Sequence, residues 1–153
     1  MQSDSPPQGR IDEGIHVFPV RVYYEDTDVG GVVYYANYLK FAERARTEML
    51  RMIGFSHSDM IQHEGLSFAV RRCEADYLKP AAFDDALEVH TGNIDMEAAS
   101  LWMDQGIRRG GDELARLRVR LACIADDGRP ARLPAGLKQA LQPFVISEEK
   151  ERV

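Results

Sequence analysis

The stretch 37-NYLKFAERARTEMLRMIGF-55 carries the clearest periodic signal in this chain of 153 residues. Its apolar side chains recur every three or four positions, which predicts an amphipathic helix with one buried stripe: Tyr38, Phe41, Ala42, Ala45, Met49, Met52 and Ile53. Asn37 is suited to cap the start of this helix, and Gly54 to end it in a left-handed conformation. At a rise of about 1.5 Å per residue, such a helix crosses a small domain.

The segments around this helix have the composition of strands and turns. Residues 17–24 are rich in β-branched and aromatic residues, which predicts a strand. A short helix capped by Ser56 or Ser58 is expected over 56–65, and a last turn or short helix over 134–144. Between them the sequence predicts four strands: 66–79, 86–95, 99–109 and 113–125.

The order of these elements indicates the fold class. One strand, a long helix and a run of four strands predict an α+β fold with the helix segregated from an antiparallel sheet. The connections over 80–85, 96–98 and 110–112 are short, which favours antiparallel neighbours. A single helix covers one face of a sheet, so a curved sheet would wrap it. The remaining surface and an edge strand then predict a homo-oligomer.

The length and charge bound the class of protein. We expect a single domain over 16–146, with flexible tails over 1–15 and 147–153. A net charge of -6 argues against nucleic acid as a partner. Cys73 and Cys123 have no metal-binding spacing and are expected to be small core residues. No signal peptide or transmembrane segment is expected, which favours a cytoplasmic location.

The connection before the helix, 24-YEDTDVGGVVYYANY-38, concentrates carboxylates, glycines and tyrosines at one joint. Gly30 and Gly31 would let the backbone approach a ligand closely. The first turn of the helix would offer unpaired N–H groups that polarise a carbonyl. A carboxylate just upstream could attack that carbonyl or activate a water. The alternative is that Glu25, Asp26 and Asp28 only cap turns and face water.

Other sites fit this connection less well. Residues 26–31 begin like a calcium-binding loop, but glycine stands at the fifth position and Asn37 stands where a bidentate glutamate is expected. Neither a GxGxxG motif nor the lysine of a P-loop is present, so a phosphate cradle is not expected. The histidines are not spaced as ligands, and no metal is expected.

The sequence YYEDTDVGGVVYYANYLKFAERARTEMLR, together with CEADYLKPAAFDDALEV, resembles the signature of the acyl-CoA thioesterases in the 4-hydroxybenzoyl-CoA thioesterase family. It most resembles the branch associated with the bacterial Tol–Pal cell-envelope system, from about Val17 to Phe144. The resemblance implies a hot-dog fold, in which one long central helix is wrapped by a curved antiparallel sheet. It also implies dimers with a continuous sheet, which commonly form homotetramers, and active sites between subunits.

The resemblance assigns roles to particular residues. It makes Asp28 the catalytic base or nucleophile and the Tyr35 N–H the group that polarises the thioester carbonyl. The branch usually has histidine at the position of Tyr35; because a backbone donor survives a change of side chain, we expect the chemistry to persist. Basic residues at the rim, Arg71, Arg72 and Lys79, are candidates for the coenzyme A phosphates.

The expected function is therefore hydrolysis of an acyl-CoA thioester to a free acid and coenzyme A, without a further cofactor. Glu43 is a weaker candidate for an assisting role, and Trp102 is expected in the core or an interface. A hydratase would need an Asp/His pair, and no histidine is near the motif. The other open alternative is a binding module that holds acyl-CoA, or partners acyl carrier protein, without turnover.

Overall fold

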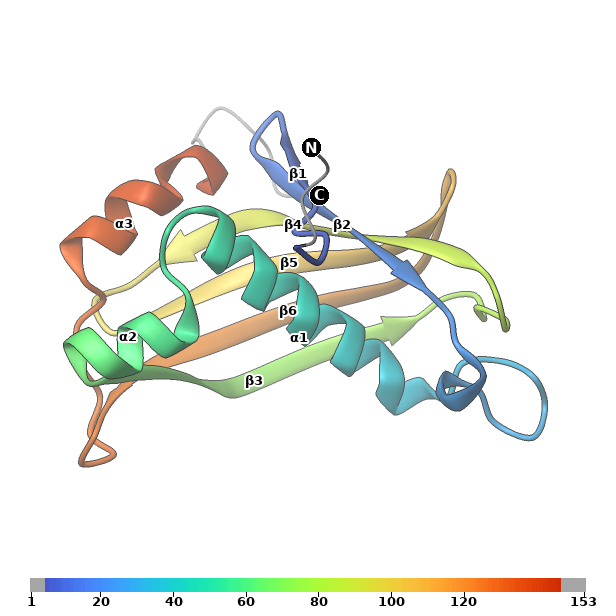
Figure 1. Cartoon of the computed structure of the whole chain (residues 1–153), viewed down its shortest axis with the longest axis horizontal. Helices are drawn as coiled ribbons and strands as arrows, with labels where there is room; N and C mark the ends of the chain where they lie inside the picture. The colour runs from blue at the N-terminus through green and yellow to red at the C-terminus, as the bar shows by residue number, and fades with distance from the viewer. Residues whose placement is uncertain (1–4, 147–153) are drawn as a thin grey trace.

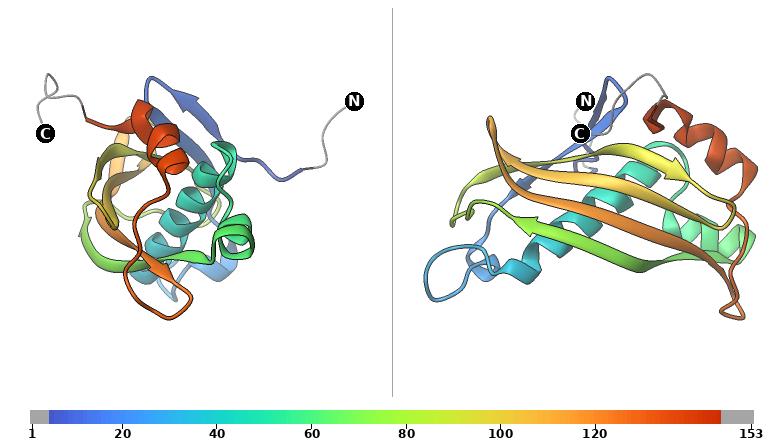
Figure 2. Two further views of the ribbon diagram at one scale, coloured as in Figure 1. Left: turned by 90° about the vertical axis from the view of Figure 1, so that its left-hand side faces the viewer. Right: turned by 180° about the vertical axis from the view of Figure 1, so that it is seen from behind.

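An antiparallel sheet curls around one long helix in the computed structural model, which describes residues 5–146 (Figures 1 and 2). The strands lie in the order β1-β2-β4-β5-β6-β3. Their bounds are β1 Arg10–Asp12, β2 Ile15–Arg21, β3 Leu66–Tyr77, β4 Ala86–Met96, β5 Ser100–Arg109 and β6 Asp112–Ala125. The helices are α1 Tyr35–Met52, α2 His57–Glu64 and α3 Ala135–Leu141, with 3-10 turns η1 Tyr24–Asp26 and η2 Gln142–Phe144. The predicted α+β class is confirmed.

Helix α1 lies against the concave face of the sheet through the predicted stripe. Phe41 and Met49 are fully buried, and the small side chains of Ala42 and Ala45 let the helix approach the strands closely. The helix begins at Tyr35, two residues before the predicted cap Asn37. The predicted end is confirmed, since Gly54 adopts a left-handed φ of 91°. The predicted cap of α2 is also confirmed, because the Ser56 hydroxyl accepts a hydrogen bond from the Asp59 N–H.

The connection from β3 to β4 differs from the expectation that short links join neighbouring strands. β3 pairs with β6 at the far edge of the sheet, and β4 pairs with β2 and β5. The curvature of the sheet brings the two strand ends together, so residues 78–85 cross beside the start of α1. Ala81, fully buried, donates its N–H to the Tyr38 hydroxyl (3.0 Å) and accepts from the Val33 N–H (2.8 Å).

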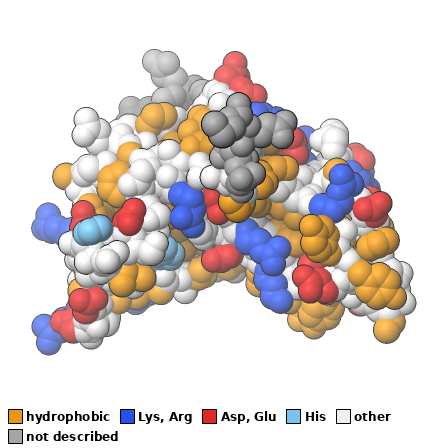
Figure 3. Space-filling model, in the orientation of Figure 1, with side chains coloured by type: hydrophobic (Ala, Val, Ile, Leu, Met, Phe, Trp, Pro, Cys, Tyr) orange, Lys and Arg blue, Asp and Glu red, His pale blue; other side chains and the backbone are white. Residues whose placement is uncertain are grey.

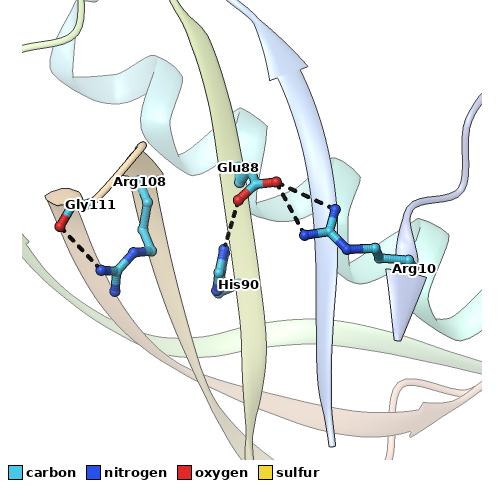
Figure 4. A network of polar contacts seen from close by, with 5 residues as sticks. All are labelled: Arg10, Glu88, His90, Arg108 and Gly111. Carbon is cyan, nitrogen blue, oxygen red and sulfur yellow. Dashed lines mark hydrogen bonds and ion pairs between the residues drawn. The ribbon is translucent and has the colours of Figure 1, made fainter. Parts of the chain in front are cut away.

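The structure describes most of the predicted N-terminal tail but none of the predicted C-terminal tail. The stretch 1–15, predicted as a tail, contains β1, which pairs with β2. Arg10 on β1 reaches the Glu88 carboxylate on β4 at 3.4 Å, and Glu88 also contacts the His90 ring at 3.2 Å (Figure 4). The fold therefore begins within the first fifteen residues. The predicted tail 147–153 lies outside the described residues.

Side chains along β6 alternate between the two faces of the sheet. Leu117, Val119, Leu121 and Cys123 are buried, whereas the arginines between them point to the convex face. Trp102 also lies on that face, 5.0 Å from the Arg118 guanidinium, rather than in the core. Cys73 is exposed on β3, so its prediction as a core residue was wrong. β3 is an edge strand, and Cys73 lies in the part of it where most side chains are exposed. No helix within residues 5–146 has both the length and the apolar character needed to cross a bilayer.

Candidate active site

The loop between η1 and α1 is closed by its own backbone at one end of the molecule. The Asp28 N–H donates to Val32 O (2.9 Å), and the Tyr34 N–H donates to Asp26 O (3.0 Å). The buried Asp26 side chain accepts from the Tyr23 N–H at 2.8 Å. Asp26 is therefore a structural residue that holds the two ends of the loop together.

Asp28 presents its carboxylate at the exposed tip of this loop. One oxygen, Oδ1, accepts a hydrogen bond from the Gly30 N–H at 2.8 Å. A Cβ at Gly30 would lie 3.2 Å from the same oxygen, so glycine leaves the carboxylate its room. Gly31 has a φ of 79°, a left-handed conformation that glycine adopts without strain. The two glycines thus shape the loop in different ways: one leaves space and the other makes the turn.

The start of helix α1 has no side-chain cap. Tyr34, the residue before the helix, makes no capping hydrogen bond, and the first turn contains no acidic residue. The Asn37 side chain instead donates to Asp26 O at 2.8 Å, which explains why it does not cap the helix. Within the described part of the chain, the N–H groups of Tyr35 and Ala36 have no hydrogen-bond partner. They can therefore donate to a bound oxygen, aided by the positive end of the helix dipole.

A small aromatic cavity adjoins the helix start. It has a volume of about 260 Å³ and is lined by Val33, Tyr35, Tyr38, Tyr77, Leu78, Lys79 and Pro80. The Tyr35 and Tyr77 rings meet edge to face at 5.9 Å, and Tyr34 lies 4.9 Å from Tyr35. A side-chain hydrogen bond with Tyr35 raises the pKa of Tyr34, and burial raises that of Tyr77. These two phenols therefore stay protonated near neutral pH.

The predicted basic residues do not form one cluster. Lys79 lines the aromatic cavity but pairs with Asp112 at 3.1 Å. Arg72 pairs with Glu74 at 3.1 Å, and Arg71 is exposed where the pairing of β3 with β6 is interrupted by a register shift. Only Lys79 thus lies beside Tyr35. No group of three or more potential metal-ligating side chains occurs in the region from residue 5 to 146.

Sequence reasoning missed Tyr38 and Tyr77 as residues of this site. Tyr38 was assigned only to the buried stripe, although its hydroxyl holds the crossing connection. Tyr77 lies within the second signature stretch, CEADYLKP, and its position before Lys79 and Pro80 is the signal that could have identified it. Both were hidden because the site joins segments about forty residues apart.

Hydrophobic side chains gather at this end of the molecule. In Figure 3 they lie over the loop and the helix start, at the right of the view. The exposed fraction is 112% for Val29, 81% for Tyr24, 59% for Tyr35 and 53% for Phe83. Large apolar side chains grouped in this way are typical of a surface that a ligand or another chain covers.

A sequence profile of the thioesterase-like superfamily matches residues 22–141. The chain belongs to this superfamily. The acyl-CoA thioester hydrolase YbgC of Escherichia coli is 51% identical over 135 residues, which cover 88% of this chain and 95% of that protein. The acyl-CoA thioesterase YbgC of Haemophilus influenzae is 42% identical over 132 residues, covering 85% and 96%. The family resemblance seen in the sequence is confirmed.

Solved structures of the thioesterase-like superfamily confirm the hot-dog fold. The crystal structure of a probable thioesterase from Bartonella henselae has a TM-score of 0.74 and 40% sequence identity, and covers 78% of this chain and 99% of that one. The long helix within a curved antiparallel sheet is therefore the shared architecture. The matched residues include the Asp28 loop, the start of α1 and the aromatic cavity.

Proposed function

We propose that this protein hydrolyses acyl-CoA thioesters to a free acid and coenzyme A. The observation that carries the proposal is an exposed Asp28 carboxylate on the loop that leads into an uncapped helix start, where two N–H groups have no hydrogen-bond partner among the described residues. The names of the Escherichia coli and Haemophilus influenzae relatives support the same reaction. The chemistry needs no metal or bound cofactor, because coenzyme A is part of the substrate.

In this proposal the thioester carbonyl oxygen accepts a hydrogen bond from the Tyr35 N–H. As the carbonyl carbon is attacked, the developing oxyanion is stabilised by that donor and by the helix dipole; one such donor is typically worth about 2.7–4 kcal/mol of the barrier. Asp28 either removes a proton from the attacking water or attacks the carbon itself. The C–S bond then breaks and the thiolate leaves, taking up a proton. In the second route, water hydrolyses the resulting mixed anhydride.

The proposal uses the backbone of Tyr35 and not its hydroxyl. The side chain contacts Tyr34 and Tyr77 in the aromatic cavity, where it can contact the acyl group. Tyr35→Phe keeps both the N–H and the ring, so kcat/KM is expected to stay within about threefold of wild type, below the tenfold that 1.4 kcal/mol represents. A loss of a hundredfold or more would assign the hydroxyl a chemical role and refute the backbone proposal.

We also propose that two chains pair through the β3 edge and share the active sites, as dimers or tetramers. β3 is a twelve-residue edge strand; Val70 and Tyr77 on it, and Leu78 directly after it, are about half exposed. A long edge with apolar side chains is a template for pairing with another chain. Val70→Lys should convert the assembly to monomers in light scattering. An unchanged mass would refute this interface.

We propose that coenzyme A, rather than acyl carrier protein, carries the acyl group. We also propose that the protein acts in the cytoplasm. Lys79 lines the aromatic cavity and Arg71 is exposed, so these two are the candidate phosphate ligands, although Lys79, like Arg72, forms an ion pair. Replacing Lys79 and Arg71 by glutamine should raise KM for acyl-CoA and leave turnover of an acyl pantetheine unchanged. An equal effect on both substrates would argue against phosphate contacts.

The deciding experiment is thiol release from short, long and aromatic acyl-CoAs by wild type and Asp28→Asn. The variant keeps the size of the side chain, so it should bind acyl-CoA normally while kcat falls by at least about a thousandfold, as for the loss of a general base or nucleophile. Wild type that binds acyl-CoA but releases no more thiol than the variant would refute catalysis. In that case the protein would be a binding module.

A further inference from the structure

A second cavity, of about 140 Å³, lies between α1, α2 and the strands β3 and β6. Its apolar walls come from Leu50, Phe68, Val70 and Leu121. Its polar lining comes from Glu43, Arg46 and Thr47 of α1 and His57 of α2, and Arg46 is the one long cationic side chain among them. A volume of this size holds roughly four or five water molecules, at about 30 Å³ each, so it suits the end of a small ligand group.

Arg46 is held in place by a buried amide. Gln105 on β5 is 1% exposed, and its Nε2 donates to Ala42 O and to the Thr91 hydroxyl, both at 3.0 Å. These two acceptors fix the orientation of the amide. Its Oε1 therefore faces Arg46 and accepts from Nη1 at 2.9 Å. The guanidinium is thus oriented before any ligand arrives.

The charge of Arg46 has no direct counterion. Ten ion pairs occur among the described residues, and none of them includes Arg46. Burial lowers the pKa of Arg46, and the Glu43 carboxylate, which lines the same cavity, partly opposes this. Glu43 is exposed and accepts from the Thr47 hydroxyl at 3.3 Å. Gln105 takes one N–H of Arg46 and leaves the others available to the cavity.

A half-buried guanidinium with free donors and one neutral partner is matched best by a carboxylate, whose two oxygens fit the guanidinium fork. We propose that Arg46 binds a carboxylate at the far end of the acyl chain, so that the protein prefers acyl thioesters of dicarboxylic acids. This inference rests on the proposed thioesterase function, whose site it extends. The apolar walls of the cavity would hold the methylene groups next to that carboxylate.

The length of the preferred acyl chain depends on whether the thioester carbonyl binds at the start of α1 in the same chain or in a second copy. Arg46 lies eleven residues after Tyr35, which is about 16 Å along α1. A substrate bound at Tyr35 of the same chain would need a long acyl group to reach Arg46. A substrate bound at the helix start of a second copy would cross the shared interface, and a short acyl group could then suffice.

The test compares charged and neutral acyl-CoAs of matched length: succinyl with butyryl, glutaryl with valeryl, adipyl with hexanoyl, and dodecanedioyl with dodecanoyl. Wild type is expected to favour the charged member of at least one pair. Arg46→Gln removes the charge but still offers an N–H to Gln105. It should reduce kcat/KM for that charged substrate about tenfold to a hundredfold, as for loss of a charged hydrogen bond, and leave the neutral one unchanged. Arg44→Gln, an exposed site on the same helix, is the matched control.

Three further results would overturn the proposal. The first is turnover of neutral acyl-CoAs with no preference for any charged one. The second is an equal effect of Arg46→Gln on both members of each pair. The third is a monomeric mass of the Arg46→Gln variant in light scattering. That result would show that Arg46 pairs with a carboxylate of a second copy of the chain and not with one of the substrate. If wild type turns over no thioester, calorimetric binding of the same pairs still measures the preference, so the two proposals fail separately.

Discussion

Gly30 and Gly31 are adjacent, yet the structure separates their roles, and alanine substitutions should have opposite consequences. A Cβ at Gly30 would lie 3.2 Å from Asp28 Oδ1, which must then move by a few tenths of an ångström. Misplacement of a catalytic group by about 1 Å costs on the order of a hundredfold in rate, so kcat/KM should fall about three- to tenfold. Gly30 has no left-handed φ, so the stability of Gly30→Ala should change by less than about 1 kcal/mol.

Gly31→Ala should show the reverse pattern. A Cβ there meets no atom within 4 Å, but the φ of 79° strains any L-residue. This strain costs about 1–2 kcal/mol, which should lower Tm by roughly 2–8 °C for a domain of this size. Gly111→Ala, where a Cβ meets open space without a left-handed φ, is the control for both variants.

The assays are thiol release under kcat/KM conditions and thermal unfolding of the same preparations. Gly30→Ala should have a lower kcat/KM and an unchanged Tm. Gly31→Ala should have a lower Tm, and its kcat/KM should fall only if the strain distorts the loop. Full activity of Gly30→Ala would show that the position of the Asp28 carboxylate does not limit the reaction. A Tm of Gly31→Ala equal to that of Gly111→Ala would show that the loop relaxes at no cost.

Three further substitutions test the fold beneath the site. Phe41→Ala should cost about 3–5 kcal/mol in urea unfolding, because the ring is fully buried between α1 and the sheet; a loss under 1 kcal/mol would contradict that packing. Gln105→Leu should cost about 2–3 kcal/mol, since it removes the partner of Arg46 and two further hydrogen bonds; a neutral result would contradict this network. His16 is fully buried, and burial lowers its pKa below the ordinary 6.5, so the unfolded chain binds a proton that the folded chain does not. The contribution of the neutral His16 ring to the free energy of unfolding should therefore be fully present above about pH 6.5 and should be lost as the pH drops towards the folded pKa. The urea midpoint of wild type should accordingly decrease more between pH 7.5 and 5.5 than that of His16→Gln, and equal decreases would exclude this residue as the cause.

The elements of this fold were readable because their signals are local. The stripe from Tyr38 to Met49 identified α1, since this pattern depends only on neighbours within a few turns of the helix. The start of α1 was missed because the Asn37 side chain donates a hydrogen bond to Asp26 O, eleven residues away, and so does not cap the helix. The sheet order was missed for a related reason: a short link says how far apart two strand ends are, not which strands pair when the sheet is strongly curved.

The candidate site likewise combines residues that the sequence identifies with residues that it does not. Asp28, Gly30 and Gly31 belong to one loop, so the sequence could present them together. The contribution of Tyr77 depends on where β3 ends relative to α1, which is a long-range outcome of sheet curvature. Arg46 was invisible for another reason, because its environment is set by the buried amide of Gln105 and not by any neighbour in the sequence.

The crossing connection of residues 78–85, beside the start of α1, joins two segments that would otherwise move separately. The Val33 N–H bonds to Ala81 O, Val32 bridges to Ala82, and the Ala81 N–H bonds to the Tyr38 hydroxyl. Loop, connection and helix start should consequently open as one cooperative unit, so their amide hydrogens should exchange with deuterium at a common rate. Selection acting on this end of the molecule would then change these two distant stretches of sequence together, because loosening either one releases the other.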